Sequence, residues 1–130
     1  AGNSRERLVV LGGFESNEFS DGQDDLMGLL TGQRASQDGV SNAANSPVNP
    51  ALVNLTLRMP LAERYSVSRE GNAEAVDHVL VNQAMLDGRY RLRTEFARIN
   101  ADFGEDNAGD FSVPLRVSEH DAIVLYLGEP

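Results

Sequence analysis

Residues 76–81 read Val-Asp-His-Val-Leu-Val, the stretch that says most about the fold. Its aliphatic side chains predict a strand over Ala75–Asn82. A strand whose apolar residues follow one another without regular alternation is typically covered on both faces. We therefore expect this strand to lie inside a layered domain.

Two further apolar runs lie far from this strand, near either end of the sequence. Leu8-Val9-Val10-Leu11 predicts a buried strand over Arg7–Leu11, which Gly12-Gly13 ends. Ile123-Val124-Leu125-Tyr126-Leu127 predicts the last strand over Ala122–Leu127. Both runs are continuously apolar, so we expect them to be covered on both faces as well.

Weaker signals fill the rest of the chain. A helical apolar face closed by Gly32 predicts a short helix over Asp24–Leu30. The segment Leu52–Leu57 stays open between a strand and a helix that begins near Pro50. The other expected elements are short strands over Tyr65–Ser68 and Tyr90–Ile99, a turn of helix over Gln83–Leu86, and loops over Glu15–Gly22, Gln33–Pro50 and Asp102–Phe111. Strands with short helices between them indicate a mixed α/β (α+β) layered domain, and the length fits one domain over residues 1–130.

Composition narrows the range of functions. The chain has 20 acidic and 11 basic side chains and a net charge of −9, so its surface repels phosphate backbones unless cations intervene. A bare basic groove for DNA is thereby disfavoured, whereas a metal-dependent phosphodiester site is compatible because a bound ion supplies positive charge. The absence of cysteine excludes disulfides, thiolate metal sites and cysteine nucleophiles. No apolar run is long enough to span a membrane.

Polar side chains stand at the ends of the three apolar strands, where functional sites tend to lie. Glu15 follows the first strand, either as a carboxylate presented to a metal or as a solvated glutamate at a turn. Asp77 and His78 are neighbours on a strand and point to opposite faces. We expect one of them in a site or hydrogen-bonded inside and the other outside; a structural pair is the alternative. Ser118-Glu119-His120-Asp121 precedes the last strand, and carboxylates beside an imidazole suit a general base or a metal neighbour as well as a solvated charge cluster.

Taken in order, these stretches resemble the C-terminal half of the endonuclease/exonuclease/phosphatase superfamily, in particular its secreted bacterial nuclease branch. That branch has Gly-Asp-Phe-Asn where this chain has Gly12-Gly13-Phe14-Glu15, and Asp-His-Ile-Leu-Val where it has residues 77–81. The branch closes with Ser-Asp-His-Asp-Pro where this chain has residues 118–122. Stretches similar to Glu18–Gly22, Ala62–Ser66, Gly71–Ala73 and Asn100–Phe103 complete the pattern, which runs from about Leu8 to Leu127.

The resemblance implies half of a two-sheet α/β sandwich with mixed or mostly antiparallel strands and short flanking helices. It also implies metal-dependent phosphodiester hydrolysis with Mg²⁺ or another divalent cation. His120 matches the family's general base, Glu119 stands where the family has an aspartate that orients this histidine or binds metal, and Asp77 matches a family aspartate near the site. The expected catalytic residues are thus His120, Glu119 and Asp77, and the expected metal ligands are Glu15 and Glu119.

Three departures from the family pattern argue against an intact site. Gly13 supplies no carboxylate where the family has aspartate, Glu15 replaces a neutral asparagine, and Glu119 is one methylene longer than aspartate. The family's N-terminal half, which supplies an acidic metal ligand and another catalytic histidine, is not among these residues. We therefore expect a catalytically degenerate phosphodiesterase-like protein. One alternative is a fragment of an active Mg²⁺-dependent extracellular nuclease or phosphatase in which Glu15 takes over the missing carboxylate's task. The other is a non-enzymatic α/β module for binding or structure.

A half-domain also has consequences for partners. Alone, it exposes an apolar sheet face of roughly several hundred Å² or more, which soluble monomers rarely tolerate. We expect the N-terminal half of the same fold or a second copy of the chain to cover this face. Nucleic acid or another phosphodiester is expected to bind through metal, and no membrane contact is expected. The resemblance to a secreted branch implies an extracellular or periplasmic location.

Overall fold

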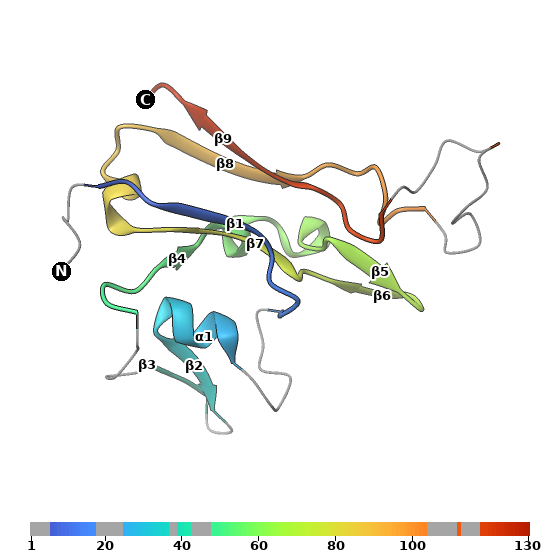
Figure 1. Cartoon of the computed structure of the whole chain (residues 1–130), viewed down its shortest axis with the longest axis horizontal. Helices are drawn as coiled ribbons and strands as arrows, with labels where there is room; N and C mark the ends of the chain where they lie inside the picture. The colour runs from blue at the N-terminus through green and yellow to red at the C-terminus, as the bar shows by residue number, and fades with distance from the viewer. Residues whose placement is uncertain (1–5, 18–24, 37–38, 43–47, 104–111, 113–117) are drawn as a thin grey trace.

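The computed structural model describes residues 6–17, 25–36, 39–42, 48–103, 112 and 118–130, with backbone only for 33–36 and 39–42. Its centre is a three-stranded antiparallel sheet in the order β1-β7-β4 (Figure 1). The middle strand, β7 (Asp77–Val81), pairs with β1 (Val9–Gly13) on one side and with β4 (Val53–Asn54) on the other. All five residues of β7 are buried, which confirms the strand expected over Ala75–Asn82 and its two covered faces.

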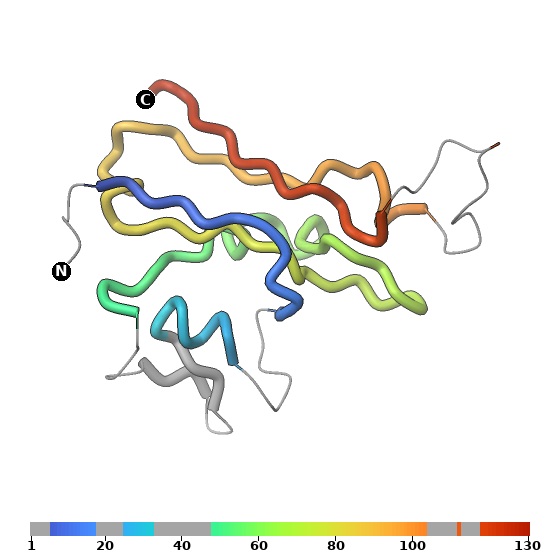
Figure 2. The backbone as a smooth tube through the Cα atoms, viewed as in Figure 1, coloured from blue at the N-terminus to red at the C-terminus, as the bar shows by residue number. Residues whose placement is uncertain are grey.

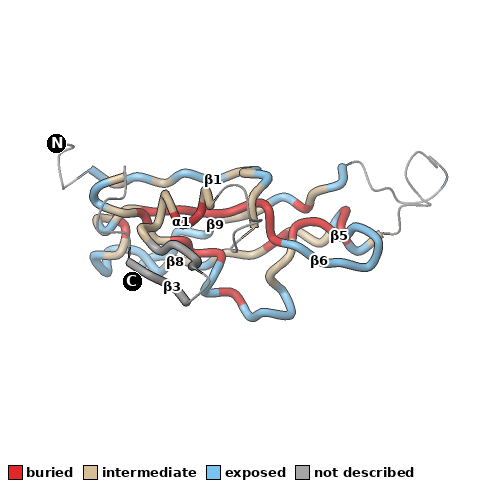
Figure 3. Tube along the Cα trace, turned by 90° about the horizontal axis from the view of Figure 1, so that it is seen from below, coloured by how far each residue is buried: buried red, intermediate tan, exposed pale blue. Residues whose placement is uncertain are grey.

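The two faces of β7 pack against different elements because side chains alternate along a strand. Val79 and Val81 contact a core cluster that includes Leu55 and Met85 and extends to the hairpin of β8 (Arg91–Phe96) and β9 (Ile123–Gly128). Leu80 packs on the opposite side against Met27 of helix α1 and against Leu52. Figure 1 shows β8 and β9 on one side of the central sheet and α1 on the other. Figure 3 shows the buried residues (red) between exposed outer segments (pale blue).

The remaining elements are short. Helix α1 covers Leu26–Thr31, begins at an Asp25 cap and ends at Gly32, whose left-handed φ of 72° favours glycine. Single turns of 3₁₀ helix cover Leu55–Arg58 (η1), Leu61–Glu63 (η2) and Gln83–Leu86 (η3). Two further antiparallel hairpins pair β2 (Gln33–Ser36) with β3 (Gly39–Asn42) and β5 (Val67–Arg69) with β6 (Asn72–Glu74). A strand-rich chain with few helices and small antiparallel sheets belongs to the α+β class.

The first and last apolar strands differ from expectation because they are not covered on both faces. In β1 and the residue before it, Leu8, Val10 and Leu11 are exposed, and in β9 Tyr126 and Leu127 are exposed. The physical reason is position: among the described residues, β1 is the edge strand of its sheet and β9 has β8 as its one partner, so their side chains have neighbours on one side only. In Figure 2 the β1 segment (blue) runs beside β7 in the central sheet, and the β9 segment (red) runs with β8 above it.

Some local predictions were also wrong. The loop expected over Gln33–Pro50 contains the β2–β3 hairpin, and β6 was not anticipated. Both alternatives for Leu52–Leu57 occur in part, since β4 runs directly into η1. The acidic loops expected over Glu15–Gly22 and Asp102–Phe111 lie mostly outside the described residues.

Across the described ranges, every helix is too short or too polar to cross a bilayer.

Candidate functional site

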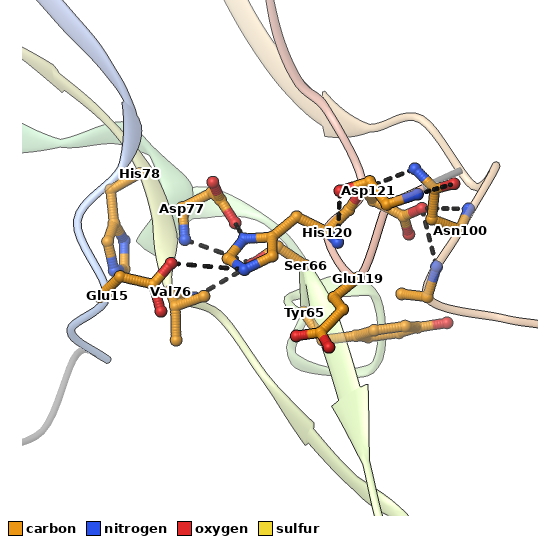
Figure 4. A network of polar contacts seen from close by, with 12 residues as sticks. Glu15, Tyr65, Ser66, Val76, Asp77, His78, Asn100, Glu119, His120 and Asp121 are labelled. Carbon is orange, nitrogen blue, oxygen red and sulfur yellow. Dashed lines mark hydrogen bonds and ion pairs between the residues drawn. The ribbon is translucent and has the colours of Figure 1, made fainter. Parts of the chain in front are cut away.

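Three segments far apart in the sequence bring Glu15, Asp77 and His120 together (Figure 4). Glu15 follows β1, Asp77 begins β7, and His120 lies just before β9. In an antiparallel pair the end of one strand lies beside the start of its neighbour, and here Gly13 faces Asp77. The Phe14 backbone N–H donates to the Val76 carbonyl at 2.9 Å and extends this pairing to the residue before Glu15. The antiparallel register is therefore what places Glu15 beside Asp77.

The His120 ring contacts a carboxylate at each of its two nitrogens. Nδ1 lies 2.7 Å from Asp77 Oδ2, and Nε2 lies 3.3 Å from Glu15 Oε1. The Asp77 side chain is 10% exposed, the His120 side chain 24% and the Glu15 side chain 65%. A buried carboxylate on Nδ1 fixes the orientation of an imidazole and directs Nε2 outward, which is the arrangement of a histidine that exchanges protons with a substrate.

Glu15 occupies the solvent side of this ring in an unusual backbone conformation. Its φ of 50° is left-handed, which non-glycine residues seldom adopt. A Cβ added to Gly13 would stand 3.2 Å from Asp77 Oδ1 and 3.9 Å from Glu15 Oε1. The Glu15 carboxylate thus lies close to the place where a side chain at position 13 would begin.

Glu119 lies outside this cluster although it is adjacent to His120 in sequence. Its Oε2 is 3.3 Å from Arg69 Nη2, and the carboxylate is 66% exposed. Figure 4 shows it directed away from the His120 ring. Glu119 does not contact Asp77 or Glu15, so the geometry does not support the catalytic and metal-binding roles predicted for it.

The side chains near His120 differ from the Mg²⁺ site that the sequence resemblance implies. Glu15 is engaged with His120, Glu119 with Arg69, and Gly13 contributes no ligand. Among the residues that the structure describes, no group of three or more acidic or histidine side chains is arranged to hold an ion. These side chains, as they stand, do not fit a divalent cation.

His78 lies on the opposite face of β7 from Asp77, as strand alternation predicts, but it is not outside. Its ring is fully buried, with Nδ1 3.1 Å from Asn54 Nδ2 and Nε2 2.8 Å from the Ser16 carbonyl oxygen. The expectation that one of the two neighbours is exposed was wrong because both faces of β7 are covered by other elements. His78 therefore links β7 to the loop that carries Glu15.

Behind His120, a second group of polar residues holds its loop, and the sequence motif did not reveal it. The fully buried Asp121 carboxylate accepts hydrogen bonds from the backbone N–H groups of Ile99, Asn100 and Ala101, and Arg98 Nη1 lies 3.0 Å from it. Asn100 Nδ2 donates to the His120 carbonyl at 2.7 Å. Of the three titratable residues in 118–121, Asp121 is thus buried, His120 is half-buried and Glu119 is exposed.

Arg98 connects this group to Tyr65. The guanidinium carbon lies 3.6 Å from the centre of the Tyr65 ring, and Nη1 donates to the Tyr65 carbonyl at 2.7 Å. The Asp102 carboxylate that accepts the Tyr65 hydroxyl raises the pKa of Tyr65, burial adds to the rise, and the Arg98 charge opposes it.

No family model matches this sequence, and no match was found among curated proteins or solved structures.

Proposed function

We propose that this chain is the C-terminal part of a phosphodiesterase-like protein that keeps a carboxylate-oriented histidine but does not cleave phosphodiesters as it stands. The observation that carries the proposal is the His120 ring, held by Asp77 on Nδ1 and covered by Glu15 on Nε2. Proton transfer to or from a substrate requires an accessible Nε2, and a second anion beside that nitrogen repels a substrate phosphate. Such a protein acts by binding or as a structural module.

We also propose that the chain folds as half of a two-sheet sandwich. It is supported by the packing of Val79 and Val81 of the central sheet against Leu92, Ile123 and Leu125 of the β8–β9 hairpin. In this proposal the N-terminal half or a second copy covers the exposed edges, and the resemblance to a secreted branch favours an extracellular or periplasmic location.

The test is a cleavage assay on this chain with DNA, RNA and a bis-aryl phosphodiester, in the presence of Mg²⁺ or Mn²⁺ and of excess chelator. The expected rates for wild type and His120→Ala are the same and equal to background. Metal-dependent cleavage by the wild type that disappears in His120→Ala would contradict the proposal. The same pair of variants in the longest natural polypeptide containing this chain extends the test to an assembled site.

A second candidate function is favoured by the position of the Glu15 carboxylate near the side-chain site that Gly13 leaves empty. In this alternative, Glu15 supplies the missing carboxylate to an active hydrolase that is completed by other residues, with Mg²⁺ or another divalent cation as its cofactor.

This second function is tested with Glu15→Gln in the natural polypeptide. The expected loss in kcat/KM is on the order of a hundredfold, the scale on which removing one group that stabilises the transition state electrostatically slows an enzyme. The matched control is Glu70→Gln, because Glu70 is also a glutamate with a φ of 50° but lies on the β5–β6 turn. Equal, small effects of the two substitutions would sink this alternative.

A further inference from the structure

Ser66 lies behind the Asp77–His120 pair and is fully buried. Its carbonyl oxygen accepts a hydrogen bond from the Asp121 backbone N–H at 2.7 Å. Its hydroxyl oxygen accepts from the backbone N–H groups of Val76 at 3.1 Å and of Asp77 at 3.2 Å. One serine therefore contacts Asp77 itself and the residue that directly follows His120.

These bonds connect the two sides of the pair. Asp77 and His120 are 43 residues apart in the sequence; Asp77 begins β7, and His120 lies in the loop before β9. Their 2.7 Å contact depends on how the start of β7 lies against the loop before β9. Ser66 is bonded to both segments, and Figure 4 shows it beneath the pair.

A serine is chemically suited to this position. A hydroxyl oxygen has two acceptor sites and so can take both N–H groups at once. Buried N–H groups are almost always paired, and alanine at position 66 would leave those of Val76 and Asp77 without this acceptor. The chain then has to shift at the start of β7 to find other partners, and the Asp77 side chain shifts with it.

We propose that Ser66 is a positioning residue for the Asp77–His120 pair, acting through the backbone of both segments. The effect of Ser66 on proton transfer at His120 rests on the proposed function, whereas its effect on the position of the His120 ring does not.

The competing explanation is that Ser66 only stabilises the fold, and Thr56 provides a matched control for it. Thr56 is also fully buried, and its hydroxyl accepts the Val79 backbone N–H of the same strand at 3.0 Å. The Thr56 hydroxyl therefore binds the middle of β7, whereas the Ser66 hydroxyl binds its start. Thr56→Ala thus removes the same kind of hydrogen bond from β7, two residues away from Asp77.

The experiment is ¹⁵N NMR of the histidine rings in this chain, which contains only two histidines, so that His120→Gln assigns the signals. The readout is the Nδ1–H of His120 and its rate of exchange with water. In the wild type the proton is held by Asp77 and exchanges slowly. In Ser66→Ala the exchange is expected to be about tenfold faster, the factor that corresponds to losing one hydrogen bond, and in Thr56→Ala less than about twofold faster.

Equal exchange rates in Ser66→Ala and Thr56→Ala would overturn the inference. If Ser66→Ala does not fold, Ser66→Cys replaces it, because a thiol keeps a weak acceptor at the same place; an intermediate acceleration supports the inference and an unchanged rate overturns it. The readout does not involve cleavage. Cleavage by this chain would therefore refute the proposed function while leaving the decision on Ser66 to the ring signal.

Discussion

His120 has two carboxylate partners whose surroundings differ, and the difference decides how much each contributes. The Asp77 side chain is nearly buried, whereas Glu15 is largely in solvent. Hydrogen bonds to charged groups away from water contribute more to stability than exposed ion pairs, which are screened. Asp77 is therefore the partner that fixes the ring, and Glu15 is the partner that covers it.

This contrast predicts the stability of two single variants. Asp77→Asn should lower the free energy of unfolding by about 1.5–3 kcal/mol, because it weakens the bond to His120 Nδ1 inside the molecule. Glu119→Gln should change it by less than about 0.5 kcal/mol, because the Glu119–Arg69 pair is exposed. Urea unfolding monitored by circular dichroism measures both, and equal losses would contradict this ranking.

Only some of the residues of the site, and only some of their contacts, could be predicted from the sequence. The order of the motifs placed Glu15, Asp77 and His120 at strand ends, and the structure brings these three together. The carboxylate on His120 was expected from its neighbour Glu119, but the bond comes from Asp77, which pairing of distant segments supplies. The side chains of Ser66 and Asp121 accept hydrogen bonds from backbone N–H groups. Such contacts leave no pattern of residues in the neighbouring sequence.

At the scale of elements, β7 was predictable and the edge strands were not. A continuous apolar run indicates a strand, but it does not say whether both faces are covered within the same chain. Val79, Leu80 and Val81 are fully buried, while Leu11 and Leu127 of equally apolar runs are each 53% exposed. The difference lies in the order of strands in the sheet, which depends on long-range pairing rather than on the composition of each run.

Helix α1 allows a prediction about an element whose local signals were read correctly. The Asp25 side chain accepts the Gly28 backbone N–H at 2.8 Å and caps the helix. Asp25→Ala should cost about 1 kcal/mol of stability, and Asp25→Asn only a few tenths, since asparagine is an equally good cap. Thermal unfolding of the three proteins checks this. A loss in Asp25→Asn as large as in Asp25→Ala would show that charge, not capping, is what counts.

At the scale of the whole molecule, the exposed residues of β1 and β9 form apolar sheet edges with nothing in the described residues to cover them. In the part of the chain that the structure describes, one edge of β1 and one edge of β9 have no strand partner, and an open edge is a template for strand addition. We expect the chain on its own to self-associate or to bind the dye ANS, and to lose both properties when a partner covers these strands.

The corresponding variant places lysine on both edges, as Leu11→Lys with Leu127→Lys, because edge lysines oppose strand addition. Sedimentation velocity should show a shift from associated species to monomer. Leu61→Lys is the control, since Leu61 is 75% exposed but lies on η2. A wild-type chain that sediments as a compact monomer and binds no ANS would rule out open edges as a source of association.

The proposed site requires Asp77 and His120 to be direct partners across 43 residues of sequence. A double-mutant cycle with Asp77→Asn, His120→Gln and the double variant measures this coupling by urea unfolding. We predict an interaction free energy of about 1–3 kcal/mol, typical of residues in contact. Additivity of the two single effects within about 0.5 kcal/mol would mean that the two side chains do not meet, and the proposed site would be contradicted.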